Sequence, residues 1–553
     1  MSLKVKYVDV PQGAQEAAQV EGQGQPFSIP AVVATGAQDV AYATLEPKGW
    51  PLDGSRRLLP SAPEGFWWSE KCSNDTGAFE EPPVITFSFP TPYTATGLSF
   101  TFWPSTDEWC SKIRVSWLNG NTLLAQTTAY PDSPRWTLQQ TVESFDRVRV
   151  ELLATNIPGH FAKVQLIEIG QTLWFGKQEI TSVHLVNEID PTLSELTVDT
   201  MTIGVKNKSG VSLVPQENQK MELYRNDKLL AVQYITESSR EAKQHYTFSC
   251  QSAIGLLEDD YLGGIYNAVP ATEVIDDILD GVEYELNAIF AQVTITGYLP
   301  VCTRREALQQ VVFALGAIAT TQGGRGIKIT PVSQITSNTF SKSQFFQGGK
   351  VETAPRVARV EVVSHRYTES EEEEILLNEE WLSGEDVLLT FDTPHHSYAM
   401  SGGTLTGSGA NWITVTANGP VTLTAKKYIH STQRHMKRNS LATAQERNNV
   451  QAVESVTLIH AGNVNEVLGR LYEIAQLRQT LSQEAIITEQ RAGQKVTAVN
   501  AWGKQIRGYI TSMESDLTAT GHTAAVKILG VETTAENAVF YAGEFYAGEE
   551  ALY

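Results

Sequence analysis

The stretch Leu98-Ser-Phe-Thr-Phe102 decides the fold of the first third of this chain. Apolar residues stand at every second position, which turns one face of an extended strand toward a core and the other toward solvent. The same alternation returns in ITFSF at 85–89, IRVSW at 113–117, VRVEL at 148–152 and VQLIEI at 164–169. Asn119-Gly120 follows one of these strands and is a strong hairpin signal. No helix-period segment separates the strands, so we expect a β-sandwich.

The length and charge of the chain limit the classes of protein to which it can belong. A chain of 553 residues exceeds the size at which one core keeps growing, so we expect about three to five domains. It carries 42 Lys and Arg against 63 Asp and Glu, a net charge of −21. Binding nucleic acid by its phosphates needs clustered basic residues, so this balance argues against such a function. We find no apolar run of about 18 residues that would span a membrane, and no apolar signal-peptide core at the N-terminus.

The four cysteines contain no CxxC pair and are too few for a disulfide scaffold or a zinc cluster. A bridge between Cys72 and Cys110 and a set of free thiols both remain open. The first 60 residues are loop-like, and QGAQEAAQVEGQGQPFS at 12–28 is typical of a flexible arm.

The middle of the chain mixes strands and helices. Asn226-Asp227 is a second hairpin signal, within alternating sequence. Residues 271–279 carry an amphipathic stripe and predict a helix that ends at Gly281. Thr303-Arg-Arg-Glu306 predicts a capping box, opening a buried helix that ends near Gly323-Gly324.

Strands return after residue 350. The Gly- and Ser-rich stretch 401–411 between them predicts a loop. A last helix is expected from Asn463 to about Leu481, with a capping box from Asn463 to Glu466. The C-terminal segment repeats YAGE at 541–544 and 546–549.

Two longer stretches carry a family resemblance. LSFTFWPSTDEWCSKIRVSWLNGNTLL at 98–124 and SFDRVRVELLATNIPGHFAKVQLIEIG at 144–170 resemble the discoidin, or coagulation factor 5/8 C-type, jelly-roll module. The resemblance covers residues 82–170 and depends on strand order. It implies a sandwich whose loops at one end meet a sugar or a lipid.

Residues 180–530 resemble the baseplate-hub and tail-tip proteins of long-tailed bacteriophages and prophages. MELYRNDKLLAVQYI at 221–235, TFSCQSAIGLLEDDYLGGIY at 247–266 and the closing pair at 503–530 carry this resemblance, and the YAGE tail fits it. It implies a trimeric ring in which two related β domains per chain imitate a hexamer below the tail tube.

Together these observations predict a mainly β protein with α+β parts: a jelly-roll sandwich, then hub-type β domains with a small helix-containing insertion. The expected segments are a 1–60 N-terminal arm, a 61–175 discoidin-like sandwich, a 176–258 first hub domain, a 259–345 mixed α/β insertion, a 346–440 β domain, a 441–532 second hub domain with a helix, and a 533–553 tail.

Catalytic and metal motifs gain no support. The sequence holds no HExxH, no GxSxG and no phosphate-binding glycine loop, and we expect no enzyme, metal or cofactor. His395-His396 is the tightest histidine pair, and a solvated loop is the favoured interpretation. The acidic run Glu369–Glu374 is expected in an exposed, solvated loop. The basic residues of 426–447 are expected on a solvated face or on one that meets an acidic neighbouring subunit.

Loops of the first module are the candidate ligand site. Aromatic rings stack on the C–H faces of sugars, and Arg and His hold hydroxyls. The glycan-binding candidates are Trp67, Trp68, Trp103, Trp109, Arg135, Trp136 and His160. Core positions are the competing interpretation for the tryptophans, and Trp117 is expected to point inward. A protein contact within an assembly is the competing role for the whole module.

The leading hypothesis is a structural component of a phage or prophage tail tip, made in the bacterial cytoplasm and located in the virion tail. Its partners would be copies of itself as a homotrimer, other tail or baseplate proteins, and a cell-surface glycan. DNA would pass an acidic lumen without specific binding. A glycan-binding surface protein or adhesin, and a tail-associated peptidoglycan hydrolase, are the alternatives.

Overall fold

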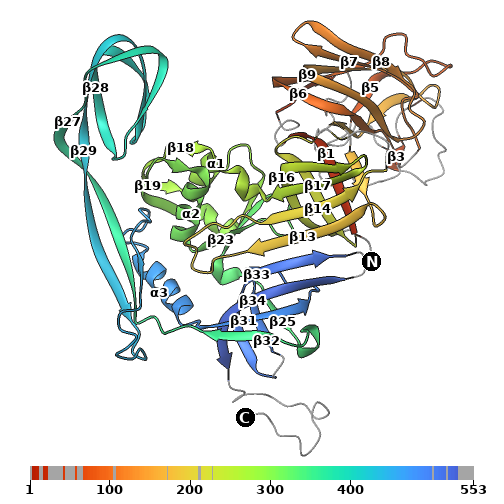
Figure 1. The fold of residues 1–553 in the computed structure, drawn as a ribbon. Helices are drawn as coiled ribbons and strands as arrows, with labels where there is room; N and C mark the ends of the chain where they lie inside the picture. The colour runs from red at the N-terminus through yellow and green to blue at the C-terminus, as the bar shows by residue number, and fades with distance from the viewer. Residues whose placement is uncertain are drawn as a thin grey trace, which may run out of the picture.

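The computed structural model describes residues 3–11, 17–22, 42–43, 46, 57–58, 67–103, 107–170, 172–208, 213, 215–226, 228–500, 503–518 and 521–533. Within these ranges the protein is mainly β, with three α-helices (Figure 1). The predicted fold class is therefore confirmed. None of the described helices is long and apolar enough to cross a membrane.

The N-terminal sandwich is built from the alternating strands that the sequence predicts. A sheet in the order β11-β6-β9-β7-β8, with β2 beside β6, shares one core with the pair β5–β10. Phe87, Val150 and Trp117 are fully buried in it, because alternate side chains of each strand point inward. The strands are β2 (Gln19–Gly22), β5 (Trp67–Cys72), β6 (Val84–Thr101), β7 (Lys112–Asn119), β8 (Thr122–Ala129), β9 (Arg135–Ala154), β10 (Phe161–Val164) and β11 (Leu166–Ile169). Two short strands, β3 (Tyr42–Ala43) and β4 (Arg57–Leu58), pair with each other.

A 13-stranded sheet forms the centre of the molecule (Figure 1). Its order is β12-β1-β15-β16-β17-β14-β13-β33-β34-β31-β26, with β32 on β33 and β25 on β32. The first lobe contains β1 (Leu3–Pro11), β12 (Thr172–Phe175), β13 (Ile180–Glu188), β14 (Thr200–Lys206), β15 (Gln219–Arg225), β16 (Lys228–Ala242) and β17 (His245–Gln251). The second lobe contains β25 (Ser337–Phe340), β26 (Lys350–Thr353), β31 (Gln479–Ile486), β32 (Lys495–Val499), β33 (Gln505–Leu517) and β34 (His522–Thr533).

One strand pair joins the two lobes. β13 and β33 run antiparallel, from His184 opposite Asp516 to Glu188 opposite Ser512. Each lobe has its own hydrophobic core. The lobes therefore have two distinct cores, although Leu517 of β33 packs into the first, and their backbone hydrogen bonding is continuous.

A mixed α/β insertion lies between β17 and β25. Its helices, α1 (Ala271–Ile278) and α2 (Arg304–Leu315), cover small sheets and share a core with them. Its strands are β18 (Asp260–Tyr261), β19 (Gly264–Pro270), β20 (Tyr284–Leu286), β21 (Thr294–Leu299), β22 (Cys302–Thr303), β23 (Ala317–Thr320) and β24 (Ile327–Pro331). Short 3-10 turns lie at Ala253–Leu256, Ala288–Gln292, Val332–Gln334 and, beyond β25, Lys342–Gln344.

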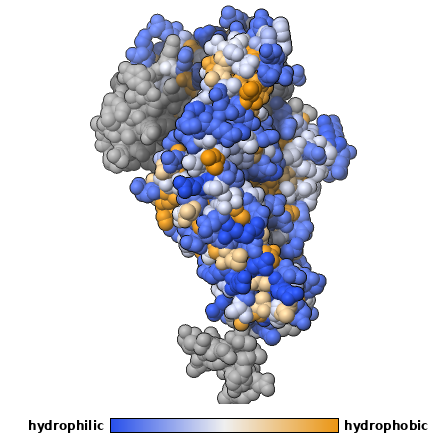
Figure 2. All heavy atoms as spheres, turned by 90° about the vertical axis from the view of Figure 1, so that its left-hand side faces the viewer, coloured by the Kyte–Doolittle hydropathy of each residue, from blue (hydrophilic) through white to orange (hydrophobic). Residues whose placement is uncertain are grey.

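A long three-stranded finger stands away from the body in Figure 1, made of β27 (Arg359–Thr390), β28 (His395–Ser408) and β29 (Trp412–Arg438). Its base also holds β30 (Val450–Val453), and α3 (Val464–Ala475) packs against it. The face of the molecule seen in Figure 2 is mostly hydrophilic, with scattered hydrophobic patches.

Several expectations about local structure were wrong. Residues 3–11 are not part of a loop-like arm: Leu3, Val5 and Tyr7 alternate into the first-lobe core, so this stretch forms β1. Most of the 401–411 stretch is not a loop but the end of β28, where the hydroxyl of Thr406 donates to Thr414 Oγ1 at 3.0 Å. Most of the predicted arm and residues 534–553 lie outside the described residues.

The charged stretches also differ from expectation. Glu369–Glu374 is not a loop but part of β27, and it pairs with the basic residues of β29. Glu371 bonds to Lys426, and Glu374 lies 3.1 Å from Lys427. The acidic run and the basic cluster thus partly neutralise each other across two neighbouring strands. His395 is not solvated, because it is 3% exposed within β28.

The helices begin where the sequence predicts, but two of them end earlier. Thr303 and Glu306 form the expected capping box on α2. This helix ends at Gly316, whose φ of +65° gives a left-handed cap, and the apolar residues that follow form β23. The box predicted on α3 is wrong: Asn463 accepts from the backbone N–H of His460 at 2.8 Å and caps no helical N–H.

Candidate binding site at one end of the sandwich

Three loops of the sandwich meet at one end. The amide nitrogen of Trp109 donates to Asn156 Oδ1 at 2.9 Å, and Asn156 Nδ2 donates to the carbonyl of Asp107 at 3.0 Å. The Trp109 indole donates to the carbonyl of Pro131 at 3.0 Å. These bonds hold the loops after β8 and β9 against the segment that leads into β7, so the sequence-distant candidates do lie near one another.

Four of the seven predicted ligand residues are buried. Trp67 and Trp103 are 2% exposed, and Trp68 and His160 are 5% exposed. Trp68 packs edge-on against Trp103 and stacks on Phe161, with ring centroids 6.3 and 6.4 Å apart. Rings covered in this way have no free face for a sugar, and their burial supports the core interpretation.

The remaining three candidates are accessible. Arg135 is exposed at the start of β9, and Trp109 and Trp136 are half-buried against the edge of the core. Tyr130, which the sequence reasoning missed, is 67% exposed, and Lys112 Nζ lies 5.8 Å from its ring centroid. The signal for Tyr130 is its position before Pro-Asp-Ser-Pro, a turn sequence that keeps a preceding ring at the surface.

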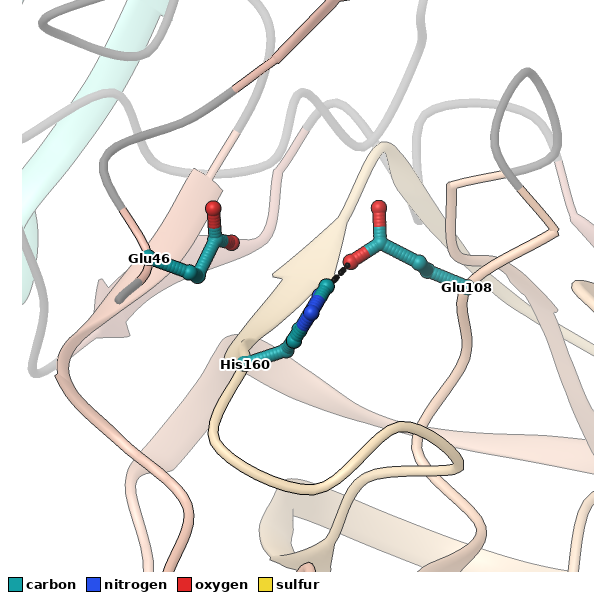
Figure 3. A group of neighbouring side chains, drawn as sticks. All are labelled: Glu46, Glu108 and His160. Carbon is teal, nitrogen blue, oxygen red and sulfur yellow. Dashed lines mark hydrogen bonds and ion pairs between the residues drawn. The ribbon is translucent and has the colours of Figure 1, made fainter. Parts of the chain in front are cut away.

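Below these loops lies a buried cluster of charged groups. Glu108 accepts from His160 Nδ1 at 2.7 Å, and Figure 3 shows Glu46 on the other side of the imidazole. Carboxylate and imidazole groups at this spacing are the ligand types that divalent metals use. Lys163 Nζ lies 2.6 Å from Glu46 Oε1 and 2.7 Å from Glu108 Oε1. The ammonium therefore places one positive charge between the two buried carboxylates.

The same cluster connects the N-terminal segment to the sandwich. Glu46 has a fully buried side chain, and its partner Lys163 is in β10. Cys72, at the end of β5, lies close enough to be affected: burial, and then the Glu46 carboxylate, raise the pKa of its thiol to about 11. Cys72 and Cys110 are both free thiols. No local sequence pattern predicts the cluster, since its members come from three distant segments, at residues 46, 108 and 160–163.

No family model matches the chain, and no curated protein matches it. Among solved structures, the chain resembles phage and prophage tail proteins, as its sequence does. It is similar to the 43 kDa tail protein of prophage MuSo2 from Shewanella oneidensis, with 10% identity and a TM-score of 0.39 over 65% of this chain and 96% of that one.

Two further likenesses concern the hub and the sandwich. An Escherichia coli component of the type VI secretion system, described as similar to the T4 tail proteins gp27 and gp5, has 8% identity and a TM-score of 0.31 over 64% of this chain and 76% of its own. A family 32 carbohydrate-binding module from C. perfringens, solved with galactose, has 11% identity and a TM-score of 0.20 over 31% of this chain and 98% of its own.

Proposed function

We propose that the chain is a structural component of a phage or prophage tail, and that three copies form a ring at the tail tip or baseplate hub. The observation that carries this proposal is the continuous sheet that joins two separately packed lobes through β13 and β33. This ladder joins the two lobes by backbone hydrogen bonds along β13 and β33. A protein whose only role is to present a binding module does not require a sheet that joins two further lobes.

The ends of the sheet support ring closure. β12 is the edge strand at one end of the central sheet, and β26 is the edge strand at the other end. Each has one strand partner among the described residues. Strand edges invite pairing with another chain, and closed symmetric association buries them. A net charge of −21 suits a channel through which DNA slides without binding. The role is mechanical and requires no catalytic group.

Electron microscopy of the purified chain tests the ring. We expect threefold rings at rising protein concentration, and labelling of tail particles at the tip with an antibody to the sandwich. A hub protein can stay monomeric until it assembles, so the purified chain is also mixed with its tail partners. A chain that remains monomeric in that mixture, and is missing from tail particles, would contradict the proposal.

We also propose that the accessible end of the sandwich binds a cell-surface glycan. Tyr130, Trp109 and Trp136 offer ring surfaces there, and Arg135 offers hydrogen-bond donors beside them. The buried candidates Trp67, Trp68, Trp103 and His160 would act by holding the loops in place. In a glycan array we expect Tyr130→Ala and Arg135→Ala to lose binding while the fold is retained.

Trp381→Ala is the matched control, because this indole is 70% exposed but lies on the finger. Equal glycan binding by all three variants would mean that Tyr130 and Arg135 do not bind the sugar. Absence of glycan binding by the unaltered chain would favour a protein contact as the role of the module. Glycan binding by a chain that never joins a tail would favour an adhesin. Release of fragments from peptidoglycan would instead favour the hydrolase.

A further inference from the structure

A pocket of about 700 Å³ lies between the α/β insertion, α3 and the second lobe. We call it the α3 pocket. Its apolar wall comes from Val293, Leu315, Val332 and Ile474, and Ile289 beside them is 50% exposed. An exposed isoleucine at the mouth of an apolar pocket indicates that a ligand or a chain segment bound there would bury its side chain.

Two basic side chains, Arg470 and Lys495, line this pocket. Among the described residues, no carboxylate lies within ion-pair distance of Arg470 or of Lys495. Arg470 Nη2 donates to the carbonyl of Phe313 at 2.6 Å, while its Nε, buried in the protein, has no hydrogen-bond partner. Lys495 Nζ lies 5.9 Å from the ring centroid of Tyr509. Burial lowers the pKa of Arg470 to about 10, although the charge of Glu466, which also lines the pocket, acts to raise it.

Residues 534–553 have the complementary chemistry. They carry four glutamates, five aromatic residues and neither Lys nor Arg. Two consecutive copies of Phe-Tyr-Ala-Gly-Glu occupy 540–544 and 545–549. Each copy contains two aromatic rings and one carboxylate. The rings suit the apolar wall of the pocket, and the carboxylate suits one or both of its cations.

The attachment point of this segment is near the pocket. β34 ends at Thr533, and its Leu529 is paired with Tyr509, which lines the pocket. The chain thus leaves the sheet four residues beyond the pocket, roughly 13 Å along a strand. The eleven residues from 534 to 544 reach up to about 36 Å when extended.

We propose that residues 534–553 bind in the α3 pocket of the same chain. Glu544 or Glu549 pairs with Arg470 and Lys495, and the aromatic rings of the same unit cover the apolar wall. Glu466 and Glu473 are exposed on the α3 side of the pocket and oppose an acidic occupant. The occupant must therefore place its carboxylates at the two cations and away from these glutamates.

Carbodiimide cross-linking of the full chain tests the contact, because it joins a lysine to a carboxylate only when the two groups touch. We expect mass spectrometry to find Lys495 joined to Glu544 or Glu549. Lys527, exposed on β34 and outside the pocket, is the internal control. Equal yields at Lys495 and Lys527 would overturn the proposal. In a mixture of light and ¹⁵N-labelled chains, cross-links that join two different chains would also overturn it.

A binding measurement gives a second test. A fluorescent peptide of residues 534–553 is titrated against the chain truncated after Thr533, with circular dichroism to check folding. We expect Arg470→Gln and Lys495→Gln each to weaken binding roughly tenfold, the value of one charge-assisted hydrogen bond. Glu473→Gln should strengthen it, and Lys527→Gln should leave it unchanged. Binding insensitive to both pocket cations would contradict the assignment, and if the truncated chain does not fold, the cross-linking result on the full chain decides.

Discussion

Lys163 is the residue on which the buried end of the sandwich depends. Its side chain is 1% exposed, between the carboxylates of Glu46 and Glu108. Removing the cation of a buried ion pair leaves uncompensated charge, which costs about 3–5 kcal/mol. We therefore expect Lys163→Met to lower the free energy of unfolding by that amount, measured by urea titration with tryptophan fluorescence.

Lys71 provides the matched comparison. It lies 2.8 Å from Glu81, but both side chains are exposed, at 72% and 82%. Solvent screens such a pair, so Lys71→Met should leave the urea midpoint where it is. Equal midpoints for the two variants would mean that the buried cluster does not stabilise the sandwich.

His522 gives the second lobe a pH dependence. It is 7% exposed, and burial, followed by the charge of Arg225, lowers its pKa from 6.5 to about 4. The unfolded chain then binds more protons than the folded one between these two values, so stability falls as the pH drops from 6.5 to 4. The loss is at most about 3 kcal/mol, taken from the pKa difference.

The variant His522→Gln should show a smaller loss of stability over the same pH range, in urea titrations at pH 7, 5.5 and 4.5. His184→Gln is the control, since this histidine is 40% exposed at the lobe junction. A wild-type slope in the His522 variant would assign the acid sensitivity to other groups.

The burial and contacts of single side chains were the hardest features to predict from the sequence. Trp117 was correctly placed in the core because alternation in one strand settles its direction. Trp67 and Trp68 could not be placed in this way, because the first three residues of β5 are all buried and show no alternation. Trp103 lies beyond the end of β6, where the alternation has stopped. The charged cluster depends on contacts between residues 46, 108, 160 and 163, and no local pattern reports such contacts.

Helices and strands were easier to predict where the sequence signal comes from neighbouring residues. The capping box of α2 involves Thr303 and Glu306 alone, with Glu306 N donating to Thr303 Oγ1 at 3.2 Å. We expect Thr303→Ala to destabilise α2 by about 1 kcal/mol and to speed hydrogen exchange in its first turn. Thr303→Ser retains the acceptor oxygen and should behave as wild type. Equal exchange in the two variants would show that the box contributes nothing.

The finger shows why other elements were missed. β27 pairs with β29 over its whole length, but its register shifts at several places, including between Glu369 and Glu373. Each shift breaks the two-residue alternation, so one long strand gives the sequence pattern of several short ones. The finger was therefore expected as separate strands with an acidic loop between them.

At the scale of the molecule, the connection between the two lobes depends on the hydrogen-bond ladder between β13 and β33. Val186, in the middle of β13, is paired with Glu514 on one side and Thr200 on the other. Proline there removes a backbone hydrogen-bond donor from the ladder, and proline is essentially confined to edge strands and bulges. We expect Val186→Pro to expose the junction to limited proteolysis while Val186→Thr does not. Resistance of the proline variant would show that core packing alone holds the lobes together.

Composition and alternation predicted a mainly β chain, but they did not predict the path of the central sheet. β1 belongs to the first lobe, although the sandwich separates it from the rest of that lobe in sequence. Such pairings are set by packing between distant segments, which a single sequence does not encode in any local window.

The junction between the lobes also dictates when the protein can finish folding. His184 and Asp516 touch across a separation of 332 residues. At roughly 5–20 residues per second, the ribosome needs about 20 to 60 seconds to make that stretch. Throughout this interval the edge of β13 has no partner, and an unpaired edge attracts other chains. The nascent protein is thus most vulnerable to aggregation after its first lobe has formed and before its last hairpin has emerged.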